Sequence, residues 1–442
     1  MKRCTLYIVC SILAIAATFA QDDRHNVQPY HRNAMAQMLI YNIDDEFGYE
    51  VYKIFMGLPA LDKFDNHNIS MRIIDNQKVT GVIGGGEKGL YHKDGSSENL
   101  ELSPAEKSKN AQAILSMLNK AQVGKHMVAK WFDLKGKNEE DATFSSKLLD
   151  ERTSYNVTIS EAELARYTVE GVNVAAAASE EMIENTFLLV TEMTYRTAEA
   201  RADAAKVALG VIGGIFDGLT GKNYGERAAE LAGDIADSYT GFKVKTQSYL
   251  YQLVWNDSIA NIFYDKYYTE TPNPAKINDF IADKSSFKMK YIGCSDAKAE
   301  KTEKKGNYGR TELLRFISQR SIDKNIANLQ STYPEFRIKT PIVAVEYDNK
   351  GKLMGYRALV GQKEGVTETR QYEVLEMKVS ANGKVTYTQV AKIKPIPNQI
   401  WDNRFDALME NDFDVAVEGT LFKVVTNGSG KQIVPGMLIR EL

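Results

Sequence analysis

The alternation of apolar and polar residues predicts two long strands in the middle of the chain. From Phe242 to Trp255, every second side chain belongs to one face of an extended segment. A period of two is typical of a half-buried strand. Asn185 to Tyr195 is rich in β-branched and aromatic residues, which favours a buried strand. We place both segments in one sheet. The face predicted for the second strand consists of Phe242, Val244, Thr246, Ser248, Leu250, Gln252 and Val254.

Helices are predicted where apolar residues recur every three or four positions. Ser103-Pro104-Ala105-Glu106 is a helix start with a serine N-cap, proline at the first position and glutamate at the third. The helix that follows carries an apolar stripe, made of Ala111, Ile114, Leu115, Leu118 and Ala121. Further helices are predicted over Phe144–Leu149, Ser160–Val169, Ala175–Ile183 and Thr311–Gln330.

Other segments are predicted from shorter patterns. Met127–Leu134, with its two aromatic residues, is interpreted as a strand. Ile69–Ile74 and Lys78–Ile83 are predicted to be strands joined by a turn at 75–77. The charged run Asp296–Gly309 is predicted to be a surface loop.

After Phe336 the pattern is that of short strands separated by turns. The predicted pairs are Pro341–Tyr347 with Leu353–Val360, Tyr372–Val379 with Val385–Ile393, and Thr420–Thr426 with Gln432–Leu438. The second pair flanks Ala381-Asn382-Gly383, and Asn-Gly is a strong hairpin signal. The C-terminal region is therefore predicted to be a small β-barrel-like module.

The fold class that these elements predict is α+β. An α/β-type N-terminal and middle region with a mixed sheet comes first, and the small all-β barrel-like module follows. The predicted divisions are a signal peptide (1–20), an N-terminal α+β region (21–105), an α/β domain (106–295) with a Gly/Ala-rich insertion (199–240), a charged loop (296–310), a linking helix (311–335) and the β module (336–442).

The first twenty residues resemble a secretory signal peptide. Lys2 and Arg3 precede the apolar run Leu6–Phe19, and Thr18-Phe19-Ala20 places small residues where signal peptidase requires them. The run is too short to span a bilayer, although a retained anchor helix is the alternative. We expect cleavage after Ala20 and export to the periplasm or the outer membrane, with the cell surface as a further alternative.

Charge and cysteine content narrow the class of protein. The net charge of −3 predicts no general affinity for nucleic acid or anionic lipid. Cys4 and Cys10 leave with the signal peptide, so Cys294 alone remains and no internal disulfide can form. Stability must therefore come from buried apolar surface.

Candidate chemistry in the sequence is sparse. Gly84-x-Gly86-x-x-Gly89 matches a dinucleotide-binding pattern, but no helix start follows, so we interpret it as a loop. The five histidines show no i, i+4 spacing for a metal, and we predict no cofactor and no metal. Asp62, Asp65 and His67 are interpreted as a solvated loop.

Two further candidates are weighed in the same way. Cys294 could pair with His126 or His92 as a reactive thiol, but a lone cysteine is more often an apolar filler. The carboxylate runs Asp44–Glu46 and Glu139–Asp141 are expected to cap turns or be solvated. No Gly-x-Ser-x-Gly elbow is present. We therefore predict a non-enzymatic protein; a hydrolase whose site is not visible in the sequence is one alternative.

A glycine stripe gives the other alternative. Gly210, Gly214 and Gly218 fall at i, i+4 and i+8, so a helix would expose bare backbone along one side. The stripe predicts either a tight helix contact inside the fold or a self-associating or membrane-contacting hairpin. The segment 207–236 could then make the protein a membrane-contacting or pore-forming component.

Short segments resemble known families. Leu359–Val366 followed by Tyr372–Glu376 is similar to the small β-barrel of flagellar-assembly-T-type periplasmic proteins, although Arg370-Gln371 departs from that pattern. Leu148–Arg152 and Glu184–Met193 resemble the curli-secretion lipoprotein family. The whole chain, especially Ile400–Phe405 and Pro435–Glu441, resembles a group of exported bacterial proteins with no assigned function. The first two resemblances imply envelope assembly or binding work, so we expect other envelope proteins or self-association as partners. Peripheral membrane contact is the alternative that the glycine-rich segment offers, and the net charge predicts no nucleic-acid partner.

Overall fold

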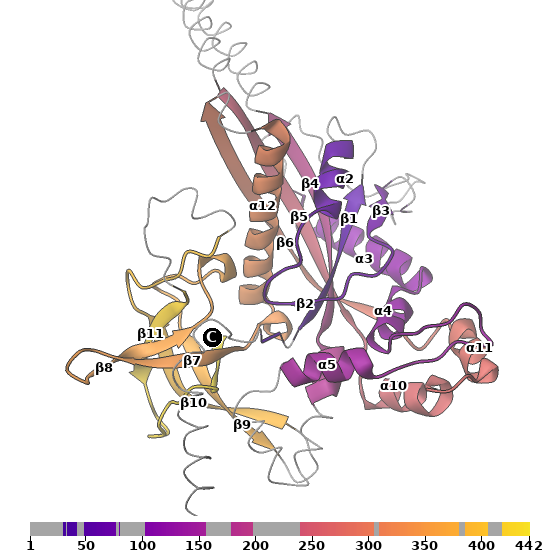
Figure 1. Ribbon diagram of the computed structural model, residues 1–442. Coiled ribbons are helices and arrows are strands. Elements are labelled where there is room, and N and C mark those ends of the chain that lie inside the picture. Colours follow the sequence, from indigo (N-terminus) through magenta and orange to yellow (C-terminus); the bar gives the residue numbers. More distant parts are fainter. Residues whose placement is uncertain are drawn as a thin grey trace, which may run out of the picture.

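The computed structural model describes residues 30–31, 33–41, 48–76, 79, 102–155, 178–197, 239–304, 309–379, 385–404 and 418–442. The predicted signal peptide, the Gly84–Gly89 loop, the helix Ser160–Val169 and the stripe Gly210, Gly214 and Gly218 lie outside these residues. The fold is α+β, as predicted, with a mixed sheet followed by a C-terminal barrel (Figure 1).

The first domain is built on a six-stranded mixed sheet. Its strands are β1 (Ala34–Tyr41), β2 (Asp65–Asn66), β3 (Ile73–Asp75), β4 (Thr186–Thr197), β5 (Tyr239–Leu253) and β6 (Met289–Lys304). The order is β2-β1-β4-β5-β6, and β3 also pairs with β1. β1 runs parallel to β2, β3 and β4, whereas β4, β5 and β6 are antiparallel neighbours. The prediction that the two long strands share a sheet is therefore confirmed.

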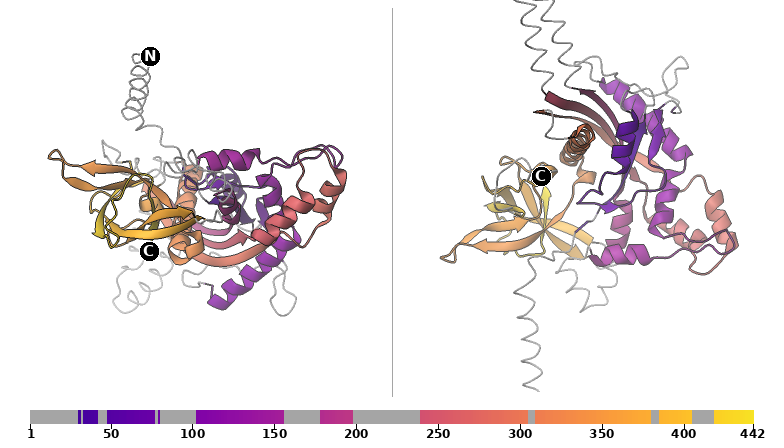
Figure 2. Two further views of the ribbon diagram at one scale, coloured as in Figure 1. Left: turned by 90° about the horizontal axis from the view of Figure 1, so that it is seen from below. Right: turned by 45° about the horizontal axis from the view of Figure 1, so that its top comes forward.

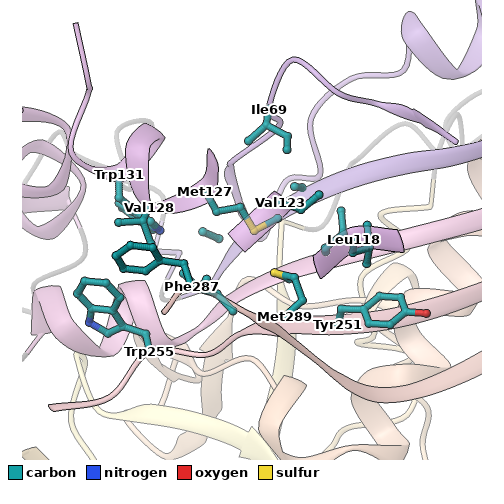
Figure 3. Packing of buried hydrophobic residues seen from close by; sticks show 14 of the residues in the cluster. Ile69, Leu118, Val123, Met127, Val128, Trp131, Tyr251, Trp255, Phe287 and Met289 are labelled. Carbon is teal, nitrogen blue, oxygen red and sulfur yellow. The ribbon is translucent and has the colours of Figure 1, made fainter. Parts of the chain in front are cut away.

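Helices cover both faces of this sheet. α3 (Pro104–Lys120) and α4 (Val123–Trp131) pack on one face, together with α5 (Lys147–Tyr155), α10 (Asp257–Ile262), the π-helix η3 (Phe263–Tyr267) and α11 (Pro274–Ala282). α2 (Gly48–Met56) and α12 (Arg310–Thr332) pack on the other. Figure 3 shows buried residues between the sheet and the helices on the α3 and α4 side. Even-numbered residues of β5 such as Phe242, Val244 and Leu250 face α12, as their alternation predicted.

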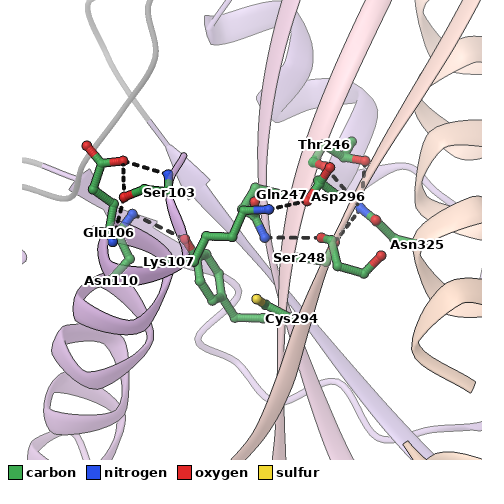
Figure 4. Close-up of polar contacts among 12 residues, drawn as sticks. Ser103, Glu106, Lys107, Asn110, Thr246, Gln247, Ser248, Cys294, Asp296 and Asn325 are labelled. Carbon is green, nitrogen blue, oxygen red and sulfur yellow. Dashed lines mark hydrogen bonds and ion pairs between the residues drawn. The ribbon is translucent and has the colours of Figure 1, made fainter. Parts of the chain in front are cut away.

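The α3 start is confirmed in detail. The Ser103 side chain accepts a hydrogen bond from the Glu106 amide at 3.3 Å, and the Glu106 carboxylate accepts one from the Ser103 amide at 2.7 Å (Figure 4). This reciprocal cap satisfies backbone donors that the first turn would otherwise leave unpaired. The helical prediction for Ala175–Ile183 also holds for residues 178–184, the part that the structure describes.

The second domain is a closed barrel. Its strands are β7 (Thr340–Tyr347), β8 (Leu353–Ala358), β9 (Tyr372–Val379), β10 (Val385–Pro395), β11 (Thr420–Thr426) and β12 (Leu438–Glu441). All neighbours are antiparallel in the closed order β10-β11-β8-β7-β12-β9. The predicted β7–β8 and β9–β10 hairpins are confirmed. The barrel surrounds its own apolar core, which includes Ile342, Val374, Ile393 and Phe422.

Two strand predictions were wrong. Met127–Leu134 belongs mostly to helix α4, because Val123, Met127 and Trp131 recur at helical spacing and are fully buried. Gln432–Leu438 forms no hairpin with β11; the last strand is β12, which pairs with β7 and β9. Pro435 and Gly436, the latter at φ +91°, interrupt that segment.

Three boundaries also differ. The predicted loop Asp296–Gly309 is strand β6 as far as Lys304, paired residue by residue with β5. An edge strand tolerates such charges, which also discourage pairing with other chains. The helix predicted from Phe144 begins at Lys147, since the Phe144 amide donates to the Thr269 carbonyl. Of Ile69–Ile74, only Ile73 and Ile74 are in a strand.

Candidate functional site

The charged residues of greatest interest lie at the seam between the sheet domain and the barrel. The barrel contributes the short helix η5 (Gln362–Glu364), which packs against α12. Gly361 and Gly365 flank η5, where the backbone lies too close to neighbouring atoms for an ordinary side chain or has a positive φ. A Cβ on Gly361 would lie 2.3 Å from the Trp401 carbonyl oxygen, and Gly365 has φ +78° with its Cβ position 3.3 Å from the Ala327 side chain.

Paired charges join the two domains here. The Lys363 ammonium lies 2.7 Å from the Asp62 carboxylate, which follows α2. The Lys63 ammonium donates to the Leu359 carbonyl oxygen. Asn403 fixes η5, because its side-chain oxygen accepts from the Lys363 amide at 2.9 Å and its nitrogen donates to Glu364 at 2.8 Å.

Asp323 of α12 is the buried carboxyl of this seam. The Gln319 side chain donates to one of its oxygens at 3.0 Å, and the other oxygen has no hydrogen-bond partner. Burial raises the pKa of Asp323 to about 6, and the nearby Asp62 and Glu364 carboxylates also raise it, whereas Lys363 lowers it. Asp323 can therefore gain or lose a proton near neutral pH.

A small pocket opens beside Asp323. It is lined by Leu61, Asp62, Lys63, Phe64, Asp323, Ile326, Gln330, Lys363 and Glu364. It has room for about one water molecule. The chemistry that it offers is therefore proton binding and charge pairing between the domains, not enclosure of a metabolite.

A second group of contacts fixes the barrel from another side. Glu181, in the helical turn before β4, pairs with Lys339 and accepts a hydrogen bond from Tyr387 of β10 at 3.3 Å. The Lys339 ammonium also lies 4.3 Å from the centre of the Tyr387 ring, a favourable cation–π geometry. The barrel is thus held to the sheet domain at two separated places.

Reversing the seam charge tests this docking. Lys363→Glu would place a fourth carboxylate beside Asp62, Asp323 and Glu364, and like charges in a partly buried site repel. We expect the variant to be cleaved by protease between the domains at least tenfold faster than the wild type. The double exchange Asp62→Lys with Lys363→Asp should restore much of the resistance. Equal cleavage rates in the wild type and Lys363→Glu would contradict this.

A buried polar network lies between α12 and the sheet. The Asn325 side-chain nitrogen donates to the hydroxyls of Thr246 at 2.7 Å and Ser248 at 2.9 Å (Figure 4). Ser321 and Thr191 continue the network, at 2.8 Å from Thr246 and 2.9 Å from Ser248. Such a network favours one register of the helix on the sheet over others.

Neither His67 nor Asp65 is in a solvated loop, and that interpretation was wrong for both. Asp65 belongs to strand β2, with only 16% of its side chain accessible. The His67 side chain is fully buried and stacks on the Trp131 indole, with ring centres 4.8 Å apart. Asp62 does have the predicted exposure, with 66% of its side chain accessible. Sequence reasoning missed His67 because its partners, Trp131 and Arg152, lie far away in the chain.

The remaining candidates have structural positions. Cys294 lies in β6 against the first apolar core, and its amide donates to the Tyr333 hydroxyl at 3.3 Å. His126 is an exposed residue of α4, and His92 lies outside the described residues. Asp141 accepts hydrogen bonds from the amides of Lys137 and Asn138, both at 2.9 Å, so this carboxylate caps a turn as expected.

Two searches limited to the described part of the chain gave negative results. No three His, Cys, Asp or Glu side chains there are grouped to hold a metal ion. No helix there is long and apolar enough to cross a bilayer.

Comparison with known proteins gives no family assignment. No known protein family matches the chain, and no curated protein matches it either.

Proposed function

We propose that the protein is a non-enzymatic, exported component of the bacterial cell envelope that binds to or assembles with other envelope components. The observation that carries this proposal is the seam between the two domains. The Lys363–Asp62 ion pair and the Glu181–Lys339–Tyr387 contacts join a six-stranded barrel to a helix-covered sheet. Two domains joined in this way present separate surfaces, and preorganised surfaces lower the entropy cost of simultaneous binding or assembly.

The signal-peptide pattern of residues 1–20 supports the envelope as the location. Fractionation of cells that carry the tagged full-length chain, followed by N-terminal sequencing, tests it. The proposal expects the mature chain to begin at Gln21 in the envelope fraction. A full-length chain with Met1 in the cytoplasm would contradict the location.

Affinity purification from cross-linked envelopes tests the function. The tagged wild type should recover one or a few envelope proteins in amounts comparable to its own. The Lys363→Glu variant, in which the barrel is no longer fixed, should recover less of any partner that contacts both domains. If purified mature protein instead turned over substrates in a broad hydrolase screen, and a single substitution abolished turnover, the enzymatic alternative would replace this proposal.

A second candidate function is membrane contact through residues 207–236. Strands β4 and β5 pair from Phe187–Gln252 to Thr197–Phe242. The last residue of β4, Thr197, and the first residue of β5, Tyr239, therefore lie at the same end of the sheet. Hairpin connections are usually two to five residues long, and much longer ones commonly carry a function. This placement favours a role for the glycine-rich segment outside the sheet.

Gly214→Leu distinguishes the two readings of the glycine stripe. If the stripe packs inside the fold, the added side chain should cost on the order of 1–3 kcal/mol by overpacking and lower the melting temperature. If the stripe contacts membrane, the variant should float less with liposomes at an unchanged melting temperature. Wild-type protein that stays in the soluble fraction at every lipid composition would eliminate the membrane reading.

A further inference from the structure

The outer wall of the barrel carries a group of lysines near its free end. Lys394 of β10 and Lys423 of β11 are direct cross-strand partners. Phe422 pairs with Tyr356 of β8, so the next position places Lys423 beside Gly355. Phe422 and Tyr356 point into the barrel core, and the alternation of strand residues therefore directs both lysines and Gly355 outward.

Two of the lysines here have no carboxylate partner. Among the residues that the structure describes, Lys394 and Lys423 form no ion pair, whereas Lys392 lies opposite Glu373 of β9 and Lys431 pairs with Glu376 at 2.6 Å. Like charges placed directly opposite each other on neighbouring strands destabilise a sheet. The Lys394–Lys423 pair is thus an electrostatic cost to the isolated protein, and an anionic surface would relieve it.

Exposed apolar side chains lie beside the lysines. Tyr347 and Leu353 are cross-strand partners at the end of the β7–β8 hairpin, with 56% and 42% of their surface exposed. Met354 is 49% exposed, and Val425 of β11 is 42% exposed. The turn between Tyr347 and Leu353 is rigid, because Asp348 accepts hydrogen bonds from the amides of two turn residues.

The lysines and apolar side chains lie on a projecting part of the barrel, not in a groove. The β7–β8 hairpin projects from the barrel on the side away from α10 and α11 in Figure 1, and it projects in both views of Figure 2. A protruding tip with exposed Tyr, Leu and Met, next to the unpaired lysines Lys394 and Lys423, suits the interface of a bilayer. There, apolar side chains enter the acyl boundary while lysines meet the headgroups.

We propose that this barrel tip docks on a lipid bilayer that contains anionic headgroups. The tip is defined as Tyr347, Leu353, Met354, Val425, Lys394 and Lys423. The net charge of −3 does not oppose this, because a surface charge acts over about one Debye length, roughly 8 Å at physiological salt. A local lysine group therefore meets the headgroups largely independently of distant carboxylates.

Flotation of the mature full chain with vesicles tests the proposal. Vesicles of phosphatidylglycerol and phosphatidylethanolamine should carry the protein, and vesicles of phosphatidylcholine alone should not. Each lysine near an anionic surface contributes to binding, so Lys394→Gln with Lys423→Gln should weaken the partition coefficient about 30-fold. Leu353→Ser with Met354→Ser should weaken it about tenfold or more through lost apolar burial.

Matched controls separate this surface from other causes. Lys284→Gln with Lys290→Gln removes two exposed lysines of the sheet domain and should leave flotation unchanged. Once the wild type floats, loss of flotation in the tip variants or in Gly214→Leu shows which of the two segments contacts the membrane. The tip variants and the lysine control are compared at an unchanged melting temperature.

Three outcomes would overturn the proposal. Wild-type protein that does not float with anionic vesicles excludes the bilayer as the occupant. Flotation that is equal in the wild type, the two tip variants and the lysine controls excludes the tip as the contact. If the tip variants instead lose a cross-linked acidic protein without any vesicle binding by the wild type, the surface is a protein interface and the bilayer is not its partner.

Discussion

Asp323→Asn is expected to stabilise the protein at pH 8 by about 1–3 kcal/mol. Burial raises the pKa of Asp323 from 3.8 to about 6, and each pKa unit corresponds to about 1.4 kcal/mol. Above pH 6 the folded protein holds a buried carboxylate that the unfolded chain would hold in water. Asparagine keeps an oxygen for the Gln319 hydrogen bond but carries no charge, so this cost is removed.

The sign of the pH dependence follows from the same shift. Because the folded pKa is raised, the stabilising contribution of protonated Asp323 is fully present below about pH 4. It is lost as the pH rises through about 6. Urea unfolding of the wild type and Asp323→Asn at several pH values should therefore show a difference in unfolding free energy that grows from about pH 4 to pH 7.

Asp279→Asn provides the control, since Asp279 is an exposed residue of α11. This variant should follow the wild type within about 0.5 kcal/mol at every pH. The difference in unfolding free energy between Asp323→Asn and the wild type could instead be the same at every pH. Asp323 would then keep its charge over this range, and the contacts of the seam would not depend on pH.

The sequence predicted those elements whose pattern is local. The alternation of Phe242, Val244 and Leu250 and the Ser103–Glu106 cap both depend on neighbours within a few residues, and both are confirmed. The helix α12 and the first two barrel hairpins were predicted for the same reason. The strand prediction for Met127–Leu134 was wrong. Aromatic residues favour strands in general, but here the burial of Val123, Met127 and Trp131 on one face favours a helix.

The seam could not be predicted, because its contacts join distant parts of the chain. Lys363 and Asp62 are 301 residues apart, and neither residue type differs from a solvated charge in the sequence. One local signal was available. Gly361 and Gly365 flank a short polar turn, and both glycines are required by close approach or positive φ. This turn lies in the segment that resembled flagellar-assembly-T-type barrels, and its role here is to dock the barrel on α12.

His67→Ala is expected to destabilise the protein by about 3–5 kcal/mol. The Nε2 atom lies 2.9 Å from the Met127 carbonyl oxygen, which can only accept, so Nε2 carries the proton. The Nδ1 atom, 3.2 Å from the Arg152 guanidinium, is then the acceptor. Alanine would remove the stack on Trp131, leave a cavity, and deprive the half-buried Arg152 of one acceptor.

The same geometry fixes the pH dependence of this contribution. Burial lowers the pKa of His67 well below 6.5, and the Arg152 charge lowers it further. The stabilising contribution of neutral His67 is therefore present above about pH 6.5 and is lost as the pH falls. The pH dependence from His67 is opposite in direction to that from Asp323. The His67 variant should therefore change the loss of stability as the pH falls below about 6.5, and the Asp323 variant should change the loss as the pH rises towards about 6.

Urea unfolding monitored by tryptophan fluorescence measures the effect, with His126→Ala as the matched control on an exposed residue of α4. The control should lie within about 0.5 kcal/mol of the wild type. His67→Gln should lose less than His67→Ala, because the amide can still donate to the Met127 carbonyl. If His67→Ala unfolded at the wild-type urea concentration between pH 5 and pH 8, the stack of His67, Trp131 and Arg152 would contribute little to stability. The acid sensitivity of the fold would then have to arise at other groups.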